Sequence, residues 1–179
     1  MNLLFILTLT VLFPATHLLS GWLFDFATFN DHISLIYLPA FLRLFNLLVL
    51  GPLKGTIATF LGGLLLMNQF EETTYIGLLN IVCSSSGPLI ALLGYQFYFK
   101  RQVQLTSLKD LATLSLMYCV CNSLIHHLVW SLAIDSFVWN YQEAIWMFIG
   151  DMVGTLFGAY LMKSLVDLMD RKGFKFSGP

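Results

Sequence analysis

Charged residues are scarce in this sequence: aspartate, glutamate, lysine and arginine together make up 11% of its 179 residues. A soluble domain carries about 25%. Hydrophobic residues make up 58%, against roughly 45–50% in soluble domains. A soluble chain of this length would lack the polar surface to cover such a core, whereas a bilayer solvates apolar side chains directly. The composition therefore predicts an integral membrane protein with the lipid bilayer as its first partner.

Basic clusters and catalytic motifs are also missing. The formal net charge is −1 and no basic cluster with interleaved aromatic residues precedes the C-terminal tail, so we expect no nucleic-acid partner. The three cysteines have none of the spacings of a metal site, and we expect neither metal nor cofactor. Common hydrolase and nucleotide motifs are absent, so we expect no enzyme. A membrane-embedded hydrolase built from Ser85, His126 and Asp151 stays open as an alternative.

Long apolar runs predict an all-α fold, a polytopic membrane bundle of about six transmembrane helices. No linker is long enough to divide residues 1–169 into separate domains, and residues 170–179 form a short basic tail. The third run is short. The predicted spans cover about residues 2–24, 33–50, 53–67, 76–98, 108–134 and 143–166.

The basic residues predict the orientation, because lysine and arginine accumulate on cytoplasmic loops. If the N-terminus is inside, eight of the nine basic residues fall on cytoplasmic segments, including Lys54, Lys100 and the tail. The opposite loops hold acidic residues, such as the Glu71/Glu72 pair, and no lysine or arginine. We therefore expect a multi-pass protein of the cell inner membrane with both termini cytoplasmic.

The ninth basic residue, Arg43, lies in the middle of the second predicted span. With a rise of ~1.5 Å per residue, Arg43, Asp151, His126 and residues 84–86 all lie roughly 12–15 Å from the outer helix ends. A lone charge in a bilayer costs about 3 to more than 10 kcal/mol. Arg43 and Asp151 are thus expected to face the protein interior and to neutralise each other or a ligand. An ion pair that only fixes helix register is the alternative.

Further polar residues share this depth. Asn122 and His126 are four residues apart and therefore lie on one helix face. We predict a pocket in the outer half of the bilayer, open to the external side and able to hold a small polar or anionic molecule. The alternative is a dry network of mutual hydrogen bonds. The predicted lining residues are Arg43, Ser85, Asn122, His126 and Asp151.

Small residues and a proline mark two further features. Gly150, Gly154 and Gly158 repeat every four residues, which predicts close helix packing within the chain; an interface between copies is the alternative. Pro88, after three serines, predicts a break or kink in the fourth helix at the depth of the polar layer.

Residues 33 to about 162 resemble the first type of membrane-associated sensor domain found in bacterial signalling proteins. The matching features are Pro39, the Gly51 turn with its glycine-rich following helix, Asn80, the SLKD start of the fifth helix and the W..IGD..G pattern of the sixth. This resemblance implies a module that senses a signal in the membrane and is usually fused to a cytoplasmic cyclase or kinase. Only about ten residues follow Met169, so we expect a separate protein partner at the cytoplasmic face.

The chain is also similar in size and predicted topology to the substrate-binding subunits of energy-coupling-factor transporters. That similarity implies an alternative function, the capture of a vitamin or metal for transport. The first helix departs from the pattern, because it lacks the small-residue spacing of those subunits. A structural accessory subunit of a larger membrane complex is the third interpretation.

Overall fold

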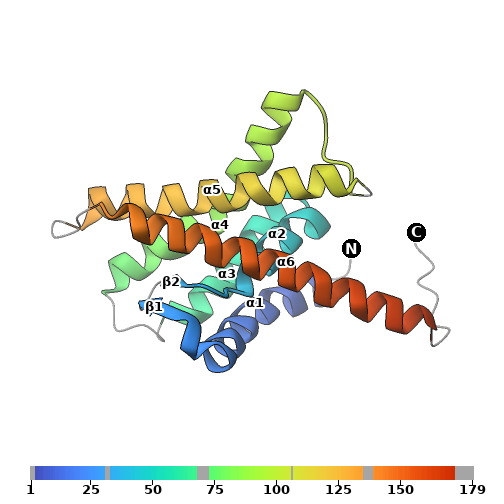
Figure 1. The fold of residues 1–179 in the computed structure, drawn as a ribbon, viewed down its shortest axis with the longest axis horizontal. Helices are drawn as coiled ribbons and strands as arrows, with labels where there is room; N and C mark the ends of the chain where they lie inside the picture. The colour runs from blue at the N-terminus through green and yellow to red at the C-terminus, as the bar shows by residue number, and fades with distance from the viewer. Residues whose placement is uncertain (1–2, 31–32, 68–72, 106, 135–138, 172–179) are drawn as a thin grey trace.

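The computed structural model describes residues 3–30, 33–67, 73–105, 107–134 and 139–171. Within these ranges the predicted all-α fold is confirmed (Figure 1). The Glu71/Glu72 loop and residues 172–179 of the predicted tail lie outside the described residues. The elements follow in the order α1 (Leu3–Leu23), a 3₁₀ turn η1 (Asp25–Ala27), β1 (Thr28–Asn30), β2 (Ile33–Ser34), α2 (Pro39–Leu50), α3 (Pro52–Leu66), α4 (Thr74–Phe99), α5 (Leu108–Ala133) and α6 (Tyr141–Arg171).

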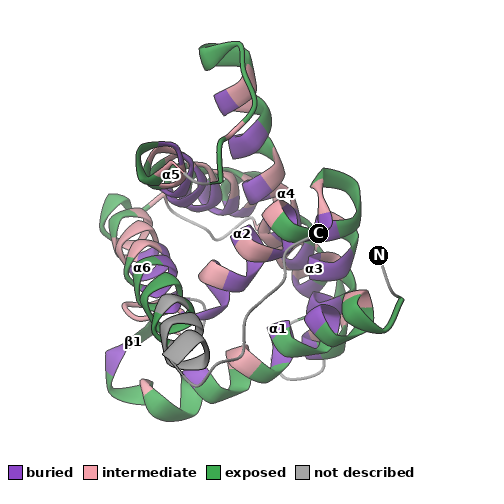
Figure 2. Cartoon of the chain, turned by 90° about the vertical axis from the view of Figure 1, so that its right-hand side faces the viewer, coloured by how far each residue is buried: buried purple, intermediate pink, exposed green. Residues whose placement is uncertain are grey.

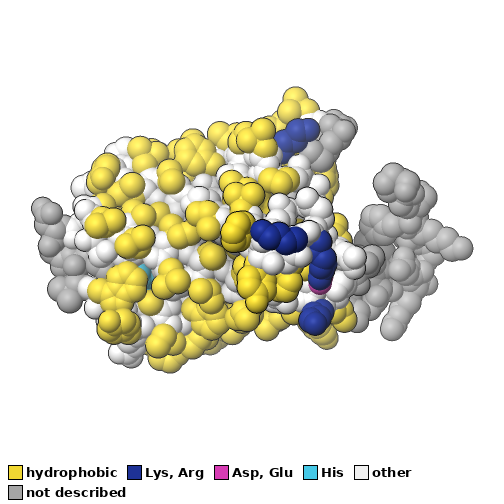
Figure 3. Space-filling model, turned by 90° about the horizontal axis from the view of Figure 1, so that it is seen from above, with side chains coloured by type: hydrophobic (Ala, Val, Ile, Leu, Met, Phe, Trp, Pro, Cys, Tyr) yellow, Lys and Arg dark blue, Asp and Glu magenta, His cyan; other side chains and the backbone are white. Residues whose placement is uncertain are grey.

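Four helices, α1, α4, α5 and α6, are long and apolar enough to cross a membrane. The third predicted span is indeed short: α3 has 15 residues and α2 only 12. They are about 22 and 18 Å long, less than the ~30 Å of a bilayer core. Figure 3 shows hydrophobic side chains covering much of one face, with lysine and arginine gathered toward one end. The fold is a polytopic membrane bundle of helices.

Buried residues lie on the sides of the helices that face one another, and exposed residues on the outside (Figure 2). The largest apolar cluster joins α2, α4 and α5, and Tyr95, Leu114 and Tyr118 lie at its centre with almost no exposed surface. Large apolar side chains cover the outside of the long helices, among them Leu128, which is 54% exposed. This exterior suits lipid rather than water.

The second helix is shorter than the predicted span 33–50, because it begins only at Pro39. Strand β2 pairs antiparallel with β1, which takes Ile33 and Ser34 out of the helix. The Tyr37 N–H donates to the Gly150 carbonyl of α6 at 3.2 Å, and the Leu35 N–H donates to a carbonyl of η1 at 2.9 Å. The backbone of this segment is thus satisfied by its neighbours, and proline, which has no N–H to satisfy, starts the helix.

Helices α2 and α3 form an antiparallel hairpin with a very tight turn. Gly51 at the turn has a φ of 84°, which side chains other than glycine rarely adopt. A Cβ on Gly55 would collide with the backbone of Asn46, so the two helices touch along their backbones. The Asn46 amide donates to the Thr59 hydroxyl at 3.3 Å across the hairpin. These contacts fix α2, and with it Arg43, inside the bundle.

The glycines of α6 pack against the chain that leads into α2. A Cβ on Gly150 would collide with the carbonyl oxygen of Ser34, and a Cβ on Gly154 would collide with that of Tyr37. A Cβ on Gly158 would run into the Phe41 ring. The glycine stripe therefore faces the interior of the chain and lets α6 approach the segment that carries Tyr37 and Arg43.

Helix α4 continues through Pro88 without a break. Proline has no N–H, so the carbonyl of Ser84, four residues earlier, loses its usual helical partner. The neighbouring hydroxyls bond to other carbonyls of the same helix: Ser85 Oγ donates to Ile81 at 2.9 Å and Ser86 Oγ to Cys83 at 3.2 Å. The continuous helix contradicts the predicted break. The alternative, a kink at this depth, stays a prediction, because the proline does remove one helical hydrogen bond.

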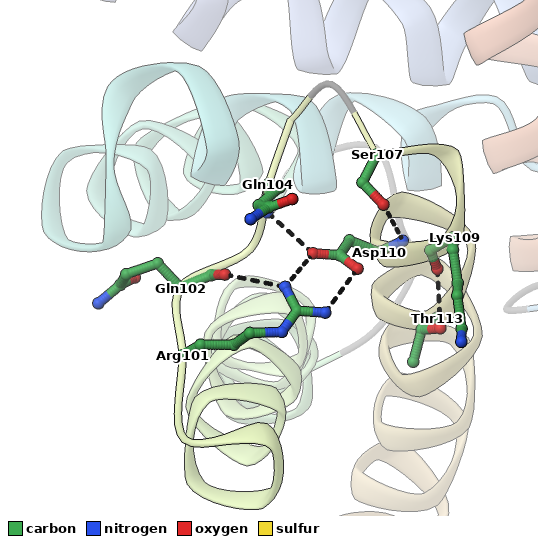
Figure 4. Close-up of polar contacts among 7 residues, drawn as sticks. All are labelled: Arg101, Gln102, Gln104, Ser107, Lys109, Asp110 and Thr113. Atoms are coloured by element: carbon green, nitrogen blue, oxygen red, sulfur yellow. Dashed lines mark hydrogen bonds and ion pairs between the residues drawn. The ribbon is translucent and has the colours of Figure 1, made fainter.

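A polar cluster joins α4 to α5 at the end of the bundle where the basic residues gather (Figure 4). Arg101 Nη2 donates to Asp110 Oδ1 at 2.9 Å, and the Gln104 N–H donates to Oδ2 at 3.1 Å. The Ser107 hydroxyl caps α5 by accepting from the Asp110 N–H at 3.3 Å. Because Asp110 accepts its hydrogen bonds, the pKa of Arg101 is raised above its ordinary value. This pair orients α5 from the end opposite the β1–β2 hairpin.

Candidate functional site

A partly open cavity of about 210 Å³ lies between the helices, toward the end of the bundle that carries the β1–β2 hairpin. A water molecule needs only about 10–15 Å³ of such volume. The cavity therefore has room for several waters or for a small organic molecule. Four of the five predicted residues line it: Arg43 from α2, Asn122 and His126 from α5, and Asp151 from α6.

Ser85, the fifth predicted residue, does not line the cavity, and its neighbour Ser84 does. The Ser85 hydroxyl points back to its own helix and donates to the Ile81 carbonyl. One residue turns a helix by about 100°, so adjacent serines face different sides. The prediction of Ser85 is therefore corrected to Ser84.

Arg43 is buried, with 6% of its surface exposed. Its Nη2 donates to the Tyr37 hydroxyl at 3.0 Å. Its Cζ atom lies 5.0 Å from the centre of the Tyr37 ring and 5.5 Å from that of Phe13, distances typical of cation–π contacts. Nε is buried and has no hydrogen-bond partner among the described residues. These contacts hold the guanidinium through aromatic rings and the neutral Tyr37 hydroxyl.

Asp151 is also buried, and it is anchored by α5. The Asn122 amide donates to Asp151 Oδ2 at 2.6 Å, and both residues are almost completely buried. A Cβ on Gly87 would lie 2.9 Å from Asn122 Oδ1, so glycine lets α4 approach at this level. Asp151 Oδ1 has no hydrogen-bond partner in the part of the chain that the structure describes.

Arg43 and Asp151 do not form a direct ion pair. Across the described ranges, no N···O distance of 4.0 Å or less joins the two side chains. Both nevertheless line the same cavity. The cavity therefore contains one positive and one negative charge that the protein itself leaves apart.

His126 presents one edge of its ring to the cavity. Its Nδ1 lies 2.9 Å from the Asn122 carbonyl oxygen, which only accepts, so Nδ1 carries a proton. Its Nε2 lies 3.3 Å from Ser84 Oγ, which can donate to that nitrogen. The ring also meets Trp130 edge to face, with ring centres 5.5 Å apart. These contacts orient His126 without any charged partner.

Sequence reasoning missed several lining residues, including Tyr37, His17 and Asn80. Tyr37 was expected inside a helix, whereas it lies in the segment before α2 and bonds to Arg43. His17 Nδ1 lies 3.1 Å from the same hydroxyl. The Trp130 indole donates to Asn80 Oδ1 at 2.6 Å and joins α5 to α4 beside the cavity. The signal that could have found His17 and Asn80 was a polar side chain inside an apolar helix near its outer end.

The geometry bears on two other kinds of site, a metal site and a hydrolase site. In the described part of the chain, no group of three or more His, Cys, Asp or Glu side chains could hold a metal ion. The hydrolase constellation is not assembled either, because Ser85 faces its own helix and His126 Nδ1 bonds to a carbonyl rather than to Asp151.

Comparison of the chain with protein-family models, curated proteins and solved structures finds no match.

Proposed function

We propose that the protein is a membrane-embedded sensory module that binds a small polar or anionic molecule in this cavity and signals to a separate protein at the cytoplasmic face. The observation that carries the proposal is the state of Arg43. It is a permanent positive charge, it is buried, and no carboxylate lies within 4.0 Å of it among the described residues.

Burying the charge of Arg43 in a membrane costs free energy. A guanidinium in a membrane interior needs compensation, and a cation–π contact with one hydroxyl supplies only part of it. If these polar residues only stabilised the packing of the helices, the lowest-energy arrangement would bring Asp151 into contact with Arg43 and close the space between them. Instead the two side chains border a cavity of about 210 Å³. The anionic group of a bound molecule would supply a counter-charge in direct contact with Arg43.

The packing of α2 and α6 supports a route from the cavity to the cytoplasmic face. Tyr37, which holds Arg43, also donates its N–H to Gly150 of α6, one residue before Asp151. A ligand between the two charges would act on both helices at once. Helix α6 then continues to Arg171, at the end of the bundle where α1 begins (Figure 1). The resemblance to sensor domains favours the same interpretation.

The positions of the charges support an inner-membrane orientation with both termini cytoplasmic. Lys54, Lys100, Arg101 and Lys109 lie in or beside the α2–α3 and α4–α5 turns, whereas the cavity lies toward the opposite helix ends. The cavity would then face the external side. A C-terminal reporter that works only in the cytoplasm tests this orientation, and a reporter active only outside contradicts it.

The transporter alternative uses the same cavity, so only the partner distinguishes the two functions. Purification from native membranes under mild conditions, followed by mass spectrometry, identifies the associated proteins. Association with a kinase or cyclase supports the sensor. Association with transport ATPases instead supports a substrate-binding subunit.

Melting of the purified protein tests the binding function. We expect members of a panel of small carboxylates, phosphates and amino acids to raise the melting temperature, and Arg43→Gln to abolish that shift. Lys54→Gln is the matched control, because it removes a positive charge at the other end of the bundle. Should Arg43→Gln fail to fold, Tyr37→Phe keeps the charge and weakens its anchor, and should reduce the shift. A panel without any stabilising compound refutes the proposal.

A further inference from the structure

The cavity contains opposite charges on two different helices, and each keeps hydrogen-bonding capacity. Arg43 on α2 has five N–H donors, one of which bonds to Tyr37. Asp151 on α6 accepts from Asn122 through Oδ2, and Oδ1 has no hydrogen-bond partner in the described ranges. Both side chains line the same space without touching. The pair presents two complementary ends for one molecule.

We infer that the ligand is a zwitterion: a small molecule that carries a carboxylate for Arg43 and an ammonium group for Asp151, as an amino acid does. This inference rests on the proposed binding function and names its ligand class. The carboxylate accepts two hydrogen bonds from the planar guanidinium, and the ammonium donates to the Asp151 oxygen. The bound state then has no uncompensated charge.

Ligands with a single charge fit less well, because they leave the other buried charge alone. A simple anion neutralises Arg43 but places a second negative charge in the cavity that contains Asp151. An amine neutralises Asp151 and meets the repulsion of Arg43. Such repulsion is strong where water is scarce and the effective dielectric constant is low. The zwitterion is the class of small molecule that satisfies both groups at once.

The remainder of the lining predicts the other part of the ligand. Along α5, His126 lies one turn and Trp130 two turns nearer the outer helix end than Asn122. Along α6, Met147 lies one turn nearer the outer end than Asp151. Ile33 of β2 and Met67 at the end of α3 add further apolar lining. These apolar side chains line the cavity nearer the outer helix ends than Arg43 and Asp151, beside polar residues of the hairpin such as Asn30. An amino acid with an apolar side chain could place that side chain against them while its charged end meets Arg43 and Asp151.

Matched compounds test the inference on the wild-type protein. Leucine, 4-methylpentanoate and isoamylamine share one hydrocarbon chain, and differ in whether they carry both charges, the carboxylate alone or the ammonium alone. Phenylalanine, 3-phenylpropionate and 2-phenylethylamine form a second such set. We expect the amino acid of at least one set to bind, its acid to bind at least about tenfold more weakly, and its amine to show no saturable binding. Titration calorimetry in detergent or nanodiscs measures all six.

Asp151→Asn then assigns the ammonium site. The variant keeps the shape and loses the charge, so the acid should bind as tightly as the amino acid. Glu143→Gln, also on α6 but outside the cavity lining, is the control and should keep the preference for the amino acid.

The outcomes separate this inference from the proposed function. If acids bind the wild type as tightly as the amino acids, or if only other compounds of the wider panel bind, the zwitterion is refuted while the binding function stands. If nothing binds, both are refuted. A preference for amino acids that survives Asp151→Asn also overturns the assignment of the ammonium group to Asp151.

Discussion

Arg43 and Asp151 line one cavity from two neighbouring helices, yet no ion pair of 4.0 Å or less joins them within the described residues. Each is held by a neutral partner instead, Arg43 by the Tyr37 hydroxyl and Asp151 by the Asn122 amide. Two charges that could cancel inside a membrane are thus kept apart. The neutral partners and the helix contacts that separate the charges are therefore the features that mutation should probe.

Tyr37→Phe should destabilise the protein by about 1–2 kcal/mol, because it removes a hydroxyl that accepts from a charged group and contacts His17. It should also weaken ligand binding, since the guanidinium loses its hydrogen bond to the Tyr37 hydroxyl. Tyr160→Phe is the matched control, because Tyr160 is 68% exposed on α6. Unfolding in a detergent series measures the free energy of each. Equal stability of the two variants would contradict the role given to Tyr37.

Gly154→Ala should lower the free energy of unfolding by about 1–3 kcal/mol, because the added Cβ collides with the Tyr37 carbonyl. The collision is with backbone, so no rotamer change relieves it, and the segment before α2 has to move. Gly94→Ala is the control: its Cβ would lie 3.4 Å from the flexible end of Met117, and alanine favours a helix. If Gly154→Ala melts at or above the wild-type temperature, the close approach of α6 to this segment is wrong.

Ser84→Ala and Ser85→Ala test which serine belongs to the cavity. Ser84 lines it and lies 3.3 Å from His126 Nε2, so its loss should weaken ligand binding about threefold to tenfold, the effect of one neutral hydrogen bond. Ser85→Ala should leave binding unchanged. Affinities come from the same titration as for the wild type. Weaker binding in Ser85→Ala, with Ser84→Ala unaffected, would restore the original prediction.

Arg101→Ala should lower the melting temperature, since it leaves the buried Asp110 carboxylate without its charged partner (Figure 4). The double variant Arg101→Ala/Asp110→Ala should recover part of the lost melting temperature. Arg101→Lys should melt between the wild type and Arg101→Ala, because lysine keeps the charge but not the bidentate geometry. None of these changes should alter ligand affinity, as the pair lies far along α4 and α5 from the cavity. A double variant that melts lower than either single variant would contradict the coupling.

The helices could be predicted from the sequence because lipid-facing residues give long apolar runs with charged or turn residues between them. Five of the six predicted spans lie within a few residues of α1, α3, α4, α5 and α6, apart from the longer C-terminal end of α6. The second span was predicted six residues too long at its start. Nothing in the hydropathy of residues 33–38 distinguishes a helix from an extended segment held by hydrogen bonds to η1 and α6.

Most of the cavity was also predictable, because charged and amide side chains in a membrane must face the interior and share a depth. That reasoning found Arg43, Asn122, His126 and Asp151. It could not choose between Ser84 and Ser85, since the rotation of α4 is set by packing contacts, such as those of Gly87 with Asn122, that no periodicity in an almost uniformly apolar helix reveals. It also did not foresee that Tyr37, rather than Asp151, would hold the arginine.

The central claim is that Arg43 anchors a bound molecule in the cavity. Calorimetric titration of the most stabilising compound of the panel, with wild type, Arg43→Gln and Lys54→Gln side by side, tests it most directly. The account predicts saturable heat at one site per chain for the wild type and for Lys54→Gln, and none for a folded Arg43→Gln protein. The same saturable heat from Arg43→Gln as from the wild type would contradict it.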